Sequence, residues 1–132
     1  MAITITENTT FKHLNADRSY VVKPGGIGRE KEVIVDVAIT ATTTYSTGGI
    51  TVDFSGVGAT MKQVYVCEII QGHGGFLCEF VPAAGNDSAT GKIKFYGIDE
   101  AAGGGSITAL DEIADTSALI QGLTLTCRIR GI

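Results

Sequence analysis

The chain has 132 residues, of which 44% are hydrophobic and 18% are charged, and its formal net charge is -4 at pH 7. A single domain of this length buries enough surface to hold a core without disulfides or a metal. Dispersed basic residues and a net negative charge argue against nucleic acid, which is bound by clustered Lys and Arg. The low charge content indicates either apolar surface covered by a partner or a well-filled sandwich with short Gly-rich loops.

Residues 1–30 form a polar, Thr-rich segment with a weak strand pattern. Short strands are expected at Ala2–Thr6 and Ser19–Lys23, and Pro24 with the glycines after it marks a break. We expect either an arm that pairs with a neighbouring subunit or the first hairpin of a sandwich domain formed by residues 31–132. No secretory signal pattern and no apolar run of membrane-spanning length is present, so we expect no membrane association.

Residues Lys31–Phe54 carry the strongest pattern in the chain. Four β-branched residues alternate here with more polar neighbours, namely Val33, Val35, Val37 and Ile39. A period of two indicates a strand with one buried face. The Tyr45–Gly49 segment then turns the chain into Ile50–Phe54, so the sequence predicts a strand, a turn and a second strand.

The middle of the chain predicts three further strands. Val64–Ile70 is apolar on both faces, which is typical of a central strand that is covered on both sides. Glycines at residues 72–75 lead into Phe76–Val81, and these two strands are predicted to form a hairpin. Asn and Asp between the glycines of residues 85–91 suit left-handed turn positions before the strand Lys92–Tyr96.

The strand pattern lapses over residues 98–122, where Thr108–Asp115 is expected to form at most a short helical turn. Long loops in compact domains are usually functional or mobile, so partner contacts are expected here. The pattern returns in Leu123–Arg130, where the residues that face one way are Leu123, Leu125, Cys127 and Ile129. We therefore expect an all-β, single-domain antiparallel β-sandwich, jelly-roll-like, with an N-terminal arm and a long loop before the last strand.

The residue types offer no catalytic constellation. The two histidines, His13 and His73, stand in no nucleophile motif. Cys67, His73 and Cys78 lack the usual zinc spacing and a fourth ligand, and the carboxylates of Asp111–Asp115 lack the spacing of a calcium loop. We expect a protein that is not an enzyme and that holds no cofactor and no metal.

Three cysteines, Cys67, Cys78 and Cys127, make an odd set on strand-like segments. Cys127 takes an apolar-facing position, where a free cysteine behaves as a small hydrophobic residue. An odd count fits assembly in a reducing cytosol. A disulfide between Cys67 and Cys78 is the alternative in an oxidising compartment.

Several short segments together carry a family resemblance. They are Val33–Ile39, Tyr45–Gly49, Gly91–Tyr96, Glu112–Leu119 and Leu123–Gly131. In this order they resemble small virion structural proteins of tailed bacteriophages, related to head-decoration or cement proteins. Such proteins commonly have a strand, a Ser-Tyr-x-Thr-Gly-Gly turn, several hairpins and a final strand that ends in Gly. The chain departs from them in the length of residues 1–30 and in the glycines of residues 72–75.

The resemblance implies a mechanical function. A decoration protein binds the outside of the expanded capsid, often as a trimer, and ties adjacent coat subunits together. It implies the major capsid protein as partner, a homotrimer, and a location on the capsid exterior of a virion assembled in the host cytoplasm. We expect contacts in the 1–30 arm and the 98–122 loop, at Ile3, Ile5, Phe11, Tyr20, Asp111, Glu112 and Asp115.

Two other functions stay open. A phage tail or neck component, or an adhesin with a sandwich fold, would occur in few copies at one vertex. A small carbohydrate-binding module would need exposed aromatic side chains on one sheet face. The chain has no Trp, and its four Tyr residues are scattered among strands and turns.

Overall fold

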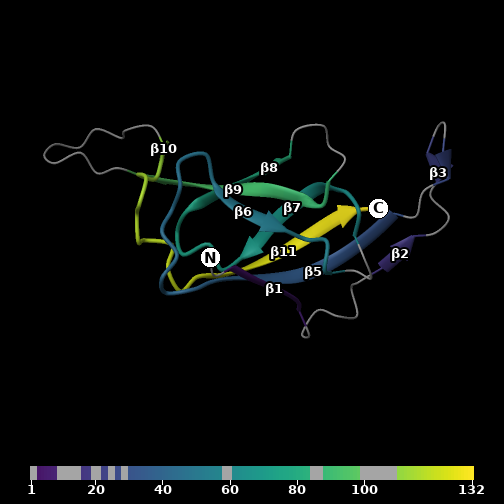
Figure 1. Ribbon diagram of the computed structural model, residues 1–132, viewed down its shortest axis with the longest axis horizontal. Helices are drawn as coiled ribbons and strands as arrows, with labels where there is room; N and C mark the ends of the chain where they lie inside the picture. Colours follow the sequence, from purple (N-terminus) through teal and green to yellow (C-terminus); the bar gives the residue numbers. More distant parts are fainter. Residues whose placement is uncertain are drawn as a thin grey trace, which may run out of the picture.

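Figure 1 shows the computed structural model, which describes residues 3–8, 16–18, 22–23, 26–27, 30–57, 61–83, 88–98 and 110–132. Nine of their eleven strands form two antiparallel sheets that face each other, and none of these residues is helical. The all-β antiparallel sandwich is confirmed, while jelly-roll-like connectivity stays a prediction. Two short strands, β3 (Val22–Lys23) and β4 (Gly26–Ile27), pair with each other.

The first sheet is built on β5 (Glu30–Ile39). One edge of β5 pairs with β11 (Thr124–Gly131), which in turn pairs with β7 (Val64–Gln71) at the far edge of the sheet. The other edge of β5 is shared, because β1 (Ile3–Glu7) pairs with its second half and β2 (Ala16–Arg18) with its first residues. These two N-terminal strands therefore belong to the first sheet of their own chain.

The second sheet repeats this plan around β9 (Thr90–Ile98). On one side of β9 lies β8 (Leu77–Pro82). The other side is shared by β6 (Ile50–Asp53), which pairs with the first half of β9, and β10 (Leu110–Glu112), which pairs with its last residues. Each sheet thus has a long strand with two short strands end to end along one edge.

The hairpin predicted between β7 and β8 is wrong, because these consecutive strands lie in different sheets. The glycines between them carry the chain across the sandwich. Gly72 has a φ of +85°, and a Cβ there would lie 1.9 Å from the carbonyl oxygen of Thr124. Among the described strands, β7 also lies at an edge of its sheet and is not the predicted central strand, and its Glu68 and Ile70 side chains are exposed. An apolar run next to a Gly-rich turn does not distinguish a hairpin from a crossing between sheets.

The predicted strand, turn and strand over residues 31–54 are confirmed, although β5 and β6 also lie in different sheets. The segment expected to form at most a helical turn contains β10 instead. Residues Leu110–Glu112 pair with residues 96–98 of β9, beyond the end of β6. These three residues form a strand because they pair with the part of β9 that β6 does not reach. Three residues are too few for their pattern to predict a strand.

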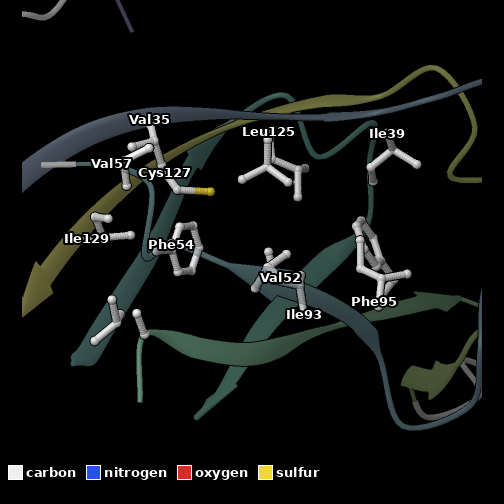
Figure 2. Packing of buried hydrophobic residues seen from close by; sticks show 14 of the residues in the cluster. Val35, Ile39, Val52, Phe54, Val57, Ile93, Phe95, Leu125, Cys127 and Ile129 are labelled. Atoms are coloured by element: carbon white, nitrogen blue, oxygen red, sulfur yellow. The ribbon is translucent and has the colours of Figure 1, made fainter. Parts of the chain in front are cut away.

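The core fills the space between the two sheets. Figure 2 shows first-sheet residues facing second-sheet residues, and the set includes Val35, Leu125, Cys127, Val52, Ile93 and Phe95, each at most 1% exposed. Burying one such aliphatic or aromatic side chain stabilises the fold by roughly 1.5–3 kcal/mol. The predicted inward direction of the alternating residues of β5 and β11, Cys127 included, is confirmed.

The outer face of the first sheet carries a polar network. The Asn8 amide donates to both carboxylate oxygens of Asp36, at 2.9 and 2.8 Å, and the Thr126 hydroxyl donates to Asp36 at 2.9 Å. Asn8 and Thr126 are buried, so their polar groups need these partners. Farther along this face, Arg128 forms an ion pair with Glu68. The network therefore joins the end of β1 to β5 and β11.

Replacing Ile129 by Ala should lower the free energy of unfolding by about 2–5 kcal/mol, because it leaves a cavity between the sheets. Leu119→Ala is the control: Leu119 is 67% exposed, so its truncation should change stability by no more than about 0.5 kcal/mol. Urea denaturation followed by circular dichroism measures both variants. Equal losses would contradict the placement of Ile129 in the core.

Candidate interaction site

One end of the sandwich exposes large apolar side chains. It is the end that holds β10, on the left in Figure 1. Leu77, Leu110 and Leu119 are 56%, 49% and 67% exposed, and Phe76 is half-buried. We call these four residues the apolar end. Exposed apolar side chains that gather on one surface mark interaction sites, so the apolar end is the candidate site.

Two adjoining hollows form the surface of the apolar end. The first, of about 490 Å³, is lined by Phe76, Ile113 and Leu119 together with the acidic residues Asp111 and Glu112. Its lining also includes Gly97, and the ring of Phe76 lies over this residue, which has no side chain.

The second hollow, of about 360 Å³, also has Phe76 in its lining. It is lined by Phe76, Leu77 and Leu110, and also by Ile69 and His73. Because both hollows share Phe76, they are neighbours on one surface. Together they offer two adjacent places for apolar side chains.

A row of aromatic rings fixes the position of Phe76. Phe76 meets Phe95 edge to face, with ring centres 6.0 Å apart and planes at 84°. Phe95 meets Tyr45 in the same way, at 6.1 Å and 88°. Such pairs contribute about 0.5–1.5 kcal/mol beyond burial alone. The ring between the two hollows is therefore held from inside the core.

Two carboxylates tie the segment that begins at β10 to the turn after β5. Oε1 of Glu112 accepts hydrogen bonds from the Tyr45 hydroxyl at 2.5 Å and from the Gly48 N–H at 2.6 Å. Oδ1 of Asp115 accepts one from the Thr47 N–H at 3.0 Å. Glu112 and Asp115 therefore hold the Tyr45–Gly49 turn in place.

Backbone hydrogen bonds reinforce this connection. The Tyr45 N–H donates to the Ser117 carbonyl at 2.9 Å, and the Thr116 N–H donates to the Tyr45 carbonyl at 2.8 Å. Thr116 has a φ of 64°, a left-handed conformation that costs a β-branched residue about 1–3 kcal/mol. The hydrogen bonds on both sides of Tyr45 offset this cost.

The hydrogen bonds to Glu112 also set its charge. The bonds from Tyr45 and Gly48 lower the pKa of Glu112, because they stabilise the carboxylate. Burial and the bond to Glu112 raise the pKa of the Tyr45 hydroxyl. At neutral pH the pair is therefore a neutral phenol that donates to a carboxylate.

The predicted interaction residues of the N-terminal segment lie away from both hollows or outside the described residues. Ile3 and Ile5 are half-buried on β1 and pack against the core. Phe11 and Tyr20 lie outside the described residues. A contact role for these four residues stays a prediction.

The structure brings the three predicted acidic residues together beside the apolar end. Asp111 is exposed and lines the first hollow, whereas Glu112 and Asp115 bind the turn of their own chain. None of the four residues of the apolar end was predicted from the sequence as a contact residue. Leu77 could have been predicted, because it lies on the solvent-facing side of β8. Cys78 and Phe80, on the other side of the strand, pack against the core. An apolar side chain at a solvent-facing position of a strand indicates a contact surface.

The three cysteines are free thiols, so the alternative disulfide between Cys67 and Cys78 is not formed. Burial raises the pKa of Cys78 to about 11, and a hydrogen bond to Cys67 together with burial raises the pKa of Cys127. Cys78 and Cys127 are therefore protonated at neutral pH, and the protonated thiol is a poor nucleophile and metal ligand.

In the described part of the chain, no group of three His, Cys, Asp or Glu residues has the arrangement to hold a metal ion. The same residues include no helix of the length and apolarity that crossing a bilayer requires.

Comparison with models of known families, with curated proteins and with solved structures found no match for this chain. The candidate site therefore rests on the geometry of its own residues.

Glu112→Gln should destabilise the protein at neutral pH, and the effect should shrink in acid. Since the folded-state pKa of Glu112 is lowered, its contribution is present above the ordinary value of 4.5 and disappears as the pH falls through the lowered value. Urea denaturation of the wild type and the variant at neutral and acidic pH measures the difference in unfolding free energy.

Asp111→Asn is the matched control, because it neutralises an exposed carboxylate next in the chain to Glu112. Its effect on stability should be small at every pH. A loss in Glu112→Gln that is the same in acid as at neutral pH would contradict the role given to the carboxylate.

Proposed function

We propose that this chain is a non-enzymatic virion structural protein, a capsid decoration protein that binds the outer surface of the expanded phage head. The observation that carries the proposal is the apolar end, where Leu77, Leu110 and Leu119 are about half exposed or more. Leaving these side chains in water is unfavourable, and a coat-protein surface that covers them gains roughly 25 cal/mol for each Å² of apolar area removed from water.

Other features support the same proposal. The site is two adjoining hollows on the surface of the sandwich, which suits docking of a protein surface. The thiols of Cys78 and Cys127 are protonated, which suits a chain that keeps its cysteines inert. A protein that binds only the assembled shell stabilises it by mass action, so many weak contacts suffice. The partner is the major capsid protein, and a homotrimer on the capsid exterior is the proposed assembly.

Co-sedimentation with capsids that lack this protein tests the proposal. The purified chain should bind expanded shells saturably and leave unexpanded precursor shells unbound. Leu119→Glu should abolish or strongly weaken binding, because it places a charge in the apolar end. Lys62→Glu is the control, since it makes a larger charge change at an exposed residue near Ile132, at the opposite end of the sandwich.

Absence of binding to both kinds of shell would overturn the decoration function. Stoichiometric recovery with purified tails or necks, at few copies per particle, would favour the tail or neck alternative instead. Equal binding of the Leu119→Glu variant and the wild type would remove the apolar end from the docking surface.

A further inference from the structure

We infer that the apolar end binds an extended segment of a partner protein in which two apolar side chains, separated by one residue, are flanked by Lys or Arg. The inference rests on the proposed function in taking the coat protein as the source of this segment. It goes further by giving the segment its conformation, its spacing and its charge.

The two hollows explain why the partner segment needs two apolar side chains. They adjoin at Phe76, which the edge-to-face contact with Phe95 holds in place. Leu119 and Ile113 line one hollow, and Leu77 and Leu110 line the other. Each hollow therefore offers apolar contact to one incoming side chain.

The adjacency of the hollows favours an extended partner. Side chains two residues apart in a strand lie on the same face, roughly 7 Å from each other. They can therefore enter neighbouring hollows together. In addition, β10 is an edge strand among the described residues, because it pairs with β9 on one side. The backbone groups on the other side of such a strand suit the addition of an extended segment.

The charges around the first hollow explain why the partner segment needs Lys or Arg. Asp111 and Glu112 line it, and Asp115 lies three residues beyond Glu112. No Lys or Arg lines either hollow among the described residues. A segment with Lys or Arg beside its apolar residues is attracted by these carboxylates, whereas an acidic segment is repelled.

Three synthetic peptides test the inference on the full chain, by titration monitored with ¹H–¹⁵N NMR at low salt. The probe is Arg-Arg-Leu-Ser-Leu-Arg-Arg, the apolar control replaces both Leu by Ser, and the charge control replaces every Arg by Glu. The probe should shift the amide signals of Phe76, Leu77, Glu112 and Leu119. It should bind at least about tenfold more tightly than either control, which corresponds to about 1.4 kcal/mol.

Two variants locate the contact. Leu119→Ser should weaken binding of the probe by about tenfold or more, the loss typical of a buried apolar anchor. Ile70→Ser is the matched control, since Ile70 is also about half exposed but lies on β7 outside both hollows, and it should leave binding unchanged.

Several results would overturn the inference: no saturable shift at millimolar probe, equal binding of the acidic peptide, or shifts confined to other surfaces. Its failure is distinguishable from failure of the proposed function. Probe binding at the hollows without capsid binding would reject the decoration function alone. Capsid binding with no selective probe binding would reject the basic, extended partner segment alone.

Discussion

The pairing of β5 with β11 organises this protein. All eight residues of β11 pair with β5, and each of the other strands of the first sheet attaches to one of these two. Their inward side chains, such as Val35 and Cys127, form one wall of the core, while Asp36 and Thr126 meet on the outer face. A slip of one residue would bury Asp36 and expose Val35, so burial on one face and hydrogen bonding on the other fix the same register.

The candidate site depends on this core through a short series of contacts. Phe76, between the two hollows, packs on Phe95, Phe95 packs on Tyr45, and Tyr45 donates to Glu112 beside the first hollow. The hollows are thus held in shape by buried rings and a charged hydrogen bond. A partner would dock there on a surface that is already formed. Binding would therefore cost less conformational entropy than it would if this protein had to order a loop.

The sequence predicted the strands whose pattern is purely local. The alternation in β5 and β11 identified both strands and their buried faces, because side chains of a half-buried strand repeat with a period of two. The placement of β7 and β8 in different sheets was not predictable in this way, since a turn rich in glycine serves a hairpin and a crossing equally well. β10 was missed because its three residues become a strand through pairing with β9.

The candidate site was predicted only in part. Asp111, Glu112 and Asp115 stood out as a cluster of charges, yet two of them bind the turn of their own chain, which depends on contacts between distant segments. The apolar end was missed, because its four residues come together only once β8, β10 and the segments next to them meet at one end of the sandwich.

The distance in sequence between β5 and β11 affects how the chain is synthesised. Lys31 pairs with Gly131, so a ribosome adds 100 further residues after Lys31 before this pair can form. At roughly 5–20 residues per second, about 5–20 s pass between the synthesis of β5 and the synthesis of its pairing partner β11. During that interval a Val- and Ile-rich strand is open to pairing with other nascent chains. Slow translation or a shortage of chaperones should therefore reduce the yield of soluble protein before it affects the stability of the finished fold.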